Sequence, residues 1–201
     1  MNRVFALRTA FRLCFPIFVL ALVTILSISS LEKWEVARNS WLVRGFGYAA
    51  LISFALSFSV TPLNRLLLLF KYKTIPVFML AFRRALGISA ACFALIHAGL
   101  VLYLQLEGNW GALIHIPFYR AGLLALIMLL ILLTTSYPRV LKLFRIKLWR
   151  HLHKLVYIIG FILLQHIWLS TFIPNWVIIM APCVFLILIL LRLLPKKLKG
   201  D

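Results

Sequence analysis

Long apolar stretches alternate with short polar segments along this chain, and each stretch is about as long as a helix that crosses a bilayer. The stretches cover about residues 13–31, 41–60, 85–106, 117–137, 152–172 and 176–194. Each has about 19 to 22 residues, which at a rise of about 1.5 Å per residue matches a hydrocarbon core about 30 Å thick. The pattern predicts an all-α membrane protein, a bundle of six transmembrane helices that forms one domain over residues 1–201.

Prolines mark the predicted breaks between the second and third stretches. The second helix is expected to end at Thr61-Pro62. The apolar segments Leu66–Phe70 and Ile75–Phe82 are too short to cross, so we expect an interfacial segment there, broken by Pro76. A cleaved signal peptide is not expected, because the first apolar run reaches span length without a clear small-residue cleavage site.

Composition excludes a soluble domain, since 64% of the residues are hydrophobic and only four are acidic. The net charge of +18 could suggest a nucleic-acid partner, but the basic residues are dispersed between apolar stretches rather than gathered on one face. We therefore expect no nucleic-acid binding. Cys14, Cys92 and Cys183 lie in or beside the stretches without a CxxC pair, which favours small buried hydrophobic residues over ligands or a disulfide.

The basic residues also predict the orientation of the chain. In the six-span topology, 18 of the 22 Lys and Arg residues lie on one side, and three of the four acidic residues lie on the other. The positive side of a membrane protein faces the cytoplasm, so both termini are expected there. The basic segment from Arg139 to Lys154 could dock an acidic electron donor or a flavin phosphate, or it could contact anionic membrane lipid.

Two histidines are expected at similar depth in the outer half of the membrane. His97 lies 12 residues into the third stretch and His166 lies 14 residues into the fifth, about 18 Å and 21 Å along their helices. Neighbouring parallel helices could bring these imidazoles face to face. Two facing neutral imidazoles are the ligand set of six-coordinate haem iron, which favours electron transfer because neither axial position stays open.

Small residues recur around His97 on the third stretch at spacings of three to four, namely Gly87, Ala90, Ala91, Ala94 and Ala98. Such a stripe could leave room for a flat macrocycle. Close packing between helices is the alternative explanation.

The other histidines lie near the predicted membrane surfaces. Helical phase relative to His166 favours His151 over His153 as a residue on the same face, and either could instead be an interfacial histidine among headgroups. His115 lies in an outer loop and is expected to be solvated. The aromatic residues near the stretch ends fit an interfacial belt, although four of them could also neighbour a haem: Tyr103, Trp110, Tyr157 and Trp168.

An ordered set of short pieces resembles the ferric-reductase-like transmembrane family. The pieces cover most of residues 58–170 and read VTPLNR, RRALG, ALIHAGL, LTTS, LWRHLHKLVY and LLQHIWLS. The resemblance implies haem b ligands, and therefore iron ligands, at His97, His153 and His166, and it selects His153 rather than His151.

The number of haems stays open, at one or two. In related NADPH oxidases two haems stack between the third and fifth spans, but here the inner third-span position falls near Arg83 and Arg84. An inner haem would need His153 and an unidentified ligand; alternatively, His153 could contact a propionate, a flavin or a quinone.

The resemblance also implies an electron-transfer subunit of the bacterial inner membrane, without a complete active site of its own. Electrons would come from a cytoplasmic flavin reductase, with FMN bound, or from the quinone pool. They would leave to a periplasmic molybdopterin enzyme that reduces methionine sulfoxide. The sequence has no GxGxxG fingerprint, so the donor is expected to be separate.

Two other functions remain to be weighed. The first is a membrane ferric or other metal reductase with the same haem and a different acceptor. The second is a small proton-coupled transporter with a histidine relay. The near absence of acidic residues in the stretches, and of a paired inverted repeat, argues against the transporter.

Overall fold

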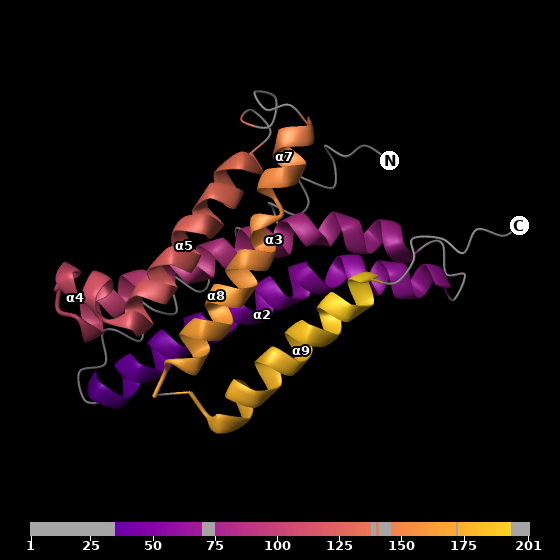
Figure 1. Ribbon diagram of the computed structural model, residues 1–201. Helices are drawn as coiled ribbons and strands as arrows, with labels where there is room; N and C mark the ends of the chain where they lie inside the picture. Colours follow the sequence, from indigo (N-terminus) through magenta and orange to yellow (C-terminus); the bar gives the residue numbers. More distant parts are fainter. Residues whose placement is uncertain (1–34, 70–74, 138–139, 141–145, 172, 194–201) are drawn as a thin grey trace, which may run out of the picture.

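The computed structural model describes residues 35–69, 75–137, 140, 146–171 and 173–193, and within them it contains helices and no strand. The predicted first span, Cys14 and the basic residues at both ends of the chain lie outside the described residues. The count of six spans and the position of the termini therefore stay predictions. The described helices are α2 (Glu35–Leu69), α3 (Ile75–Leu100), the π-helical segment η2 (Val101–Gln105), α4 (Trp110–His115), α5 (Pro117–Thr135), α7 (Ile146–Leu152), α8 (Leu155–Trp168) and α9 (Asn175–Leu193) (Figure 1).

Four of these helical segments are long and apolar enough to cross a bilayer, which makes the protein a multi-pass membrane protein. They match the second, third, fourth and sixth predicted spans and cover Trp41–Leu67, Phe82–Gln105, Pro117–Thr135 and Asn175–Leu193. The fifth predicted span, about residues 152–172, corresponds to α8, which begins after a turn at His153 and Lys154 that separates it from α7. With 14 residues, α8 is about 21 Å long and shorter than the hydrocarbon core.

The predicted breaks at the two prolines are wrong. α2 continues through Pro62 to Leu69, so the second helix does not end at Thr61-Pro62. Residues 66–69 belong to α2, and Ile75–Phe82 forms the start of α3 without a break at Pro76. The candidate membrane span of this helix begins at Phe82, so the interfacial location of residues 75–81 stays a prediction. Pro76 is tolerated because it lies in the first helical turn, where the backbone N–H has no intrahelical acceptor.

An arginine from α9 supplies the hydrogen bond that Pro62 cannot make. The ring of Pro62 removes the N–H that would bind the carbonyl of Phe58, four residues earlier. Nη2 of Arg192 donates to the Phe58 carbonyl at 2.9 Å, and Nη1 donates to the Tyr157 hydroxyl at 2.6 Å. The guanidinium carbon also lies 4.0 Å from the centre of the Phe58 ring. One side chain thus joins α9 to α2 and α8.

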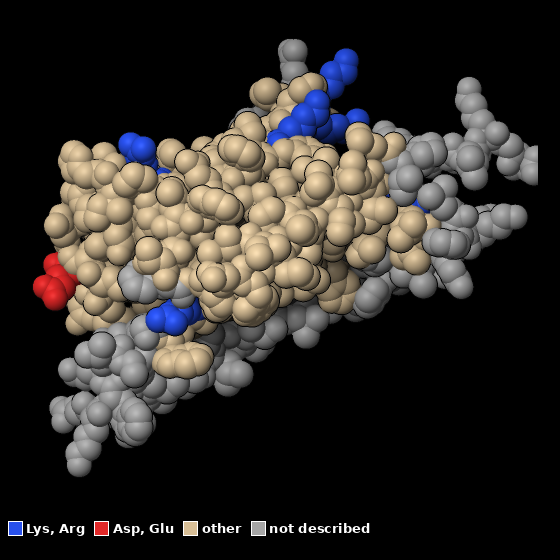
Figure 2. Space-filling model, turned by 60° about the horizontal axis from the view of Figure 1, so that its bottom comes forward, with Lys and Arg blue, Asp and Glu red and all other residues tan. Residues whose placement is uncertain are grey.

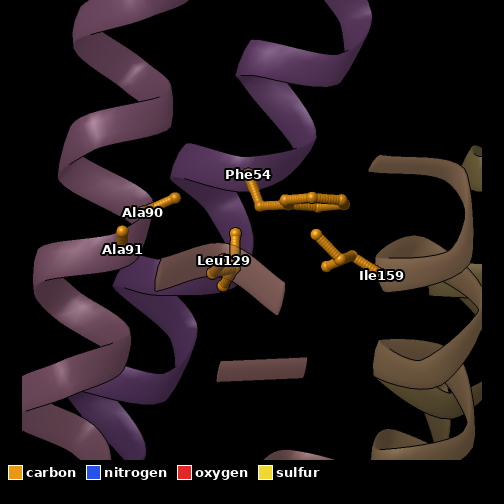
Figure 3. Close-up of a cluster of buried hydrophobic side chains, with 5 residues drawn as sticks. All are labelled: Phe54, Ala90, Ala91, Leu129 and Ile159. Carbon is orange, nitrogen blue, oxygen red and sulfur yellow. The ribbon is translucent and has the colours of Figure 1, made fainter. Parts of the chain in front are cut away.

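The helices form a closed ring in the order α2, α3, α5, α8 and α9, with α9 returning to contact α2. A small core fills part of its interior, where Phe54 of α2 packs with four residues of α3, α5 and α8: Ala90, Ala91, Leu129 and Ile159 (Figure 3). The outer surface is largely apolar, as a lipid-facing surface must be, and α9 exposes many large side chains. Cys183 is exposed there and Cys92 is partly buried, so the expected burial is wrong for Cys183.

Charged side chains lie toward the ends of the described bundle. Figure 2 shows the largest group of Lys and Arg atoms on the side where α7 lies, two smaller basic groups toward the end that carries the acidic atoms, and a broad uncharged surface between them. The α7 end includes Lys147, Arg150 and Lys154, whereas Glu107 lies between η2 and α4. Arg44 and Arg120 are also exposed, and the orientation in which α7 faces the cytoplasm stays a prediction.

Candidate functional site

His97 and His166 lie opposite each other inside the ring of helices. Their ring centres are 6.5 Å apart and their planes are inclined by 79°. His97 lies near the end of α3 and His166 near the end of α8. These two helices share no extensive direct contact, so the imidazoles meet across the interior of the bundle and not at an interface between neighbouring helices.

Each imidazole is held by a backbone carbonyl from a neighbouring helix. Nδ1 of His97 is 2.8 Å from the Val43 carbonyl of α2, and Nδ1 of His166 is 2.9 Å from the Phe118 carbonyl of α5. A carbonyl oxygen can only accept, so Nδ1 carries the proton and donates it in both rings. The lone pair of Nε2 is then available to a metal, and the hydrogen bond at Nδ1 fixes the tautomer and orients the ring.

Two glycines leave space for these rings. A Cβ atom at Gly47 would lie 3.1 Å from Cε1 of His97, and a Cβ at Gly122 would lie 2.9 Å from Cε1 of His166. His166 is further confined by the Phe118 ring, which stacks on it at 4.3 Å and 14°. Sequence reasoning missed both glycines, although each occupies an apolar helix at a depth close to a candidate histidine.

Both imidazoles line a cavity of about 470 Å³ enclosed mainly by α2, α3, α5 and α8. This volume is in the range of about 300 to 1,000 Å³ that small-molecule and cofactor pockets occupy. Ala94 and Ala98 line the cavity, whereas Ala90 and Ala91 are buried in the core. Both explanations of the small residues therefore hold in part: Ala90 and Ala91 allow close helix packing, and Ala94 and Ala98 leave space beside His97.

The distance between the rings suits one iron held by two imidazoles. Metal–imidazole bonds of about 2.0 Å, with a ring nitrogen about 1.1 Å from the ring centre, separate two axial ligands by about 6.3 Å between centres. The observed 6.5 Å agrees with this value. Because the apolar wall also suits a macrocycle, the residues present fit a bis-histidine haem, although the ligand assignment itself stays a prediction.

His153 lies away from this cavity, in the turn between α7 and α8. Its ring is 4.2 Å from that of Trp149, and its Nε2 atom is buried without a hydrogen-bond partner among the described residues. The Trp149 indole in turn donates to the Thr135 carbonyl at 3.2 Å, which ties α7 to the end of α5. Arg84 of α3 donates to the next carbonyl, that of Ser136. A buried, unsatisfied imidazole nitrogen calls for a ligand or a water.

The remaining candidates lie outside the cavity or at its edge. His151 is exposed, with Nδ1 donating to the Lys147 carbonyl at 2.8 Å, and His115 is exposed at the end of α4. Of the four aromatic residues proposed as haem neighbours, Trp110 lines the cavity, Tyr157 binds Arg192, and Tyr103 and Trp168 are exposed. In the described part of the chain, no three His, Cys, Asp or Glu side chains form a metal-binding group.

The profile of the family described as ferric reductase like transmembrane component matches residues 46–164, which include His97 and His153 and end two residues before His166. A relative from Xanthomonas campestris pv. campestris (strain 8004), named protein-methionine-sulfoxide reductase heme-binding subunit MsrQ, is 31% identical over 129 residues, covering 61% of this chain and 54% of the relative. A relative of the same name from Deinococcus radiodurans is 35% identical over 89 residues, covering 43% of this chain and 44% of the relative.

The chain thus spans about half the length of the curated relatives it matches. No solved structure matches it.

Proposed function

This chain belongs to the ferric reductase-like transmembrane family, whose profile matches more than half of it, and we propose that it is a haem b-binding subunit that carries electrons across a bacterial inner membrane. One observation carries the proposal. Two imidazoles with matching tautomers face each other across an apolar cavity, at the spacing of two axial ligands of one iron.

The roles of the residues follow from their contacts. His97 and His166 would hold the iron through Nε2, while the carbonyls of Val43 and Phe118 keep the protons on Nδ1. When bound, haem b would supply one-electron redox chemistry. Ligation by both imidazoles would favour electron transfer over the binding of oxygen.

We place a second cofactor contact at His153. Its buried Nε2 atom and its position on the α7 side of the bundle suit a ligand of a second haem nearer the electron donor. Contact with a haem propionate, a flavin or a quinone would use the same nitrogen as a hydrogen-bonding group. The amount of haem per protein distinguishes ligation from these alternatives.

The partners are proposed from the names of the relatives, which describe heme-binding subunits of a protein-methionine-sulfoxide reductase. The acceptor would be a periplasmic, MsrP-like molybdopterin reductase that acts on methionine sulfoxide. The donor would be a cytoplasmic flavin reductase, with FMN bound at the interface, or the quinone pool. The basic residues of α7 would face that donor and the anionic lipid of the inner leaflet.

The name of the matched family supports a second candidate, a ferric reductase with the same haem site. The acceptor separates the two functions. Dithionite-reduced protein in micelles should be reoxidised by the periplasmic reductase in the first case and by chelated ferric ion alone in the second.

The haem site is tested by three alanine variants of the full chain, purified in detergent and compared by pyridine haemochrome assay. His97→Ala and His166→Ala should lose most of the haem, because each removes one axial ligand. His115→Ala is the matched control and should retain it, since His115 is exposed on α4. Full haem retention in both ligand variants would refute the assignment, and a folded but colourless wild type would favour the transporter.

A further inference from the structure

We propose that Gly47 and Gly122 are positioning residues, which let the two candidate ligand imidazoles approach the helices that orient them. The inference rests on the proposed function. Both sites share one arrangement. Each imidazole donates a hydrogen bond to a backbone carbonyl of a neighbouring helix, and the residue four positions after that carbonyl in the neighbouring helix is a glycine. The pairs are Val43 with Gly47 on α2, and Phe118 with Gly122 on α5.

Helix geometry explains this spacing. In an α-helix the carbonyl of residue i already accepts from the N–H of residue i+4, and the Cβ of residue i+4 tilts back toward the N-terminus. A side chain at i+4 therefore covers the side of that carbonyl. An imidazole that donates to the same oxygen from a neighbouring helix needs this space. Glycine at i+4 is the residue that leaves it open.

The distances show how little room remains. With the present rings, a Cβ at Gly47 would be 3.1 Å from Cε1 and 3.2 Å from Nδ1 of His97. A Cβ at Gly122 would be 2.9 Å and 3.2 Å from the same atoms of His166. Ordinary contacts of this kind begin near 3.4 Å. An alanine would therefore push each ring by a few tenths of an ångström.

The rings cannot absorb this displacement without changing the site. Moving away from Gly122 lengthens the bond of 2.9 Å from His166 to Phe118 or disturbs the ring stacking at 4.3 Å. Moving away from Gly47 lengthens the bond of 2.8 Å from His97 to Val43. The imidazole is rigid, so Nε2 moves with Nδ1, and the orientation of the axial ligand changes.

Another glycine provides a matched control. Gly45 lies on α2 two residues before Gly47, and a Cβ there would meet nothing within 4 Å. Gly45 also lies outside the lining of the cavity. Alanine at Gly45 adds the same methyl group and the same helix propensity without approaching a histidine. A difference between this variant and those at Gly47 and Gly122 is therefore due to contact with the imidazoles.

The first experiment compares Gly47→Ala, Gly122→Ala and Gly45→Ala in the full chain, purified in detergent. The first two should bind haem about 10-fold more weakly or worse, as is usual when a group orienting a metal ligand is disturbed. The haem that remains should show shifted g-values in the low-spin ferric electron paramagnetic resonance spectrum. The Gly45→Ala control should match the wild type. Haem affinity and g-values equal to those of this control would overturn the proposal.

A second experiment needs no haem. Gly47→Ala should lower the melting temperature of the apoprotein, but it should have little effect in a His97→Ala background, where the ring it meets is absent. Gly122→Ala should behave in the same way with His166→Ala. Equal effects in both backgrounds would contradict the contact. Wild-type protein that binds no haem would refute the proposed function, while this coupling would still be measurable.

Discussion

Replacing Arg192 by methionine tests the contact that joins α9 to the rest of the ring. Methionine keeps much of the length and the apolar character of the side chain but donates no hydrogen bond. The change removes the bonds of 2.9 Å to the Phe58 carbonyl and 2.6 Å to the Tyr157 hydroxyl. The hydroxyl can turn toward another partner. The carbonyl, whose helical donor is missing at Pro62, is left unsatisfied.

The magnitude follows from these two bonds. Hydrogen bonds between helices in membrane proteins contribute about 0.6 kcal/mol on average and at most about 1.7 kcal/mol. An orphaned buried carbonyl costs about 1 to 3 kcal/mol. We therefore expect Arg192→Met to lower the free energy of unfolding by about 2 to 3 kcal/mol. Arg150→Met on exposed α7 is the control and should change it by less than about 0.5 kcal/mol.

Pro62→Ala makes the test specific, because alanine restores an N–H that can bind the Phe58 carbonyl. The loss caused by Arg192→Met should then be smaller by about 1 kcal/mol. The assay is a double-mutant cycle, measured by denaturant unfolding of the full chain in detergent micelles. If the two changes add to within about 0.3 to 0.5 kcal/mol, Arg192 does not replace the bond missing at Pro62, and the reasoning fails.

Two further predictions concern α8 and the turn that precedes it. His153→Ala should reduce the amount of haem per protein by about half if His153 holds a second haem. His151→Ala is the control and should leave the haem content unchanged, because His151 is exposed. A pyridine haemochrome assay measures the haem content of both variants, and equal values would exclude ligation by His153. Gly160→Ala should lower the free energy of unfolding by about 1 to 3 kcal/mol, because its Cβ would overlap the Phe185 ring of α9. Gly99→Ala, measured by the same unfolding assay, is the control, and equal stabilities would show that α9 shifts freely.

Hydropathy predicted the second, third, fourth and sixth spans closely, because a bilayer imposes both length and polarity on each crossing helix. The breaks predicted at Pro62 and Pro76 were wrong, and for Pro62 the physical reason lies outside the local sequence. Pro62 stays inside α2 because Arg192, 130 residues later, donates to the carbonyl that the proline leaves free. Pro76 begins a helix because its missing N–H has no role in the first turn.

The similar depth of His97 and His166 could also be predicted, since counting residues along two helices fixes depth in a membrane. Their hydrogen bonds could not. The acceptors are backbone carbonyls, which every residue has, and they lie 54 and 48 residues away along the chain. The glycines at 47 and 122 become informative only once the histidine that approaches each of them is known.

The ring of helices explains why each imidazole needs a second helix to hold it. The most extensive helix contacts in the described bundle are those of α2 with α3 and of α5 with α8. His97 of α3 donates to α2, and His166 of α8 donates to α5, so each ring is fixed within one closely packed pair. The cavity lies between the pairs. The packing of α3 against α5 therefore sets the distance between the imidazoles, while the contacts within each pair set their orientation.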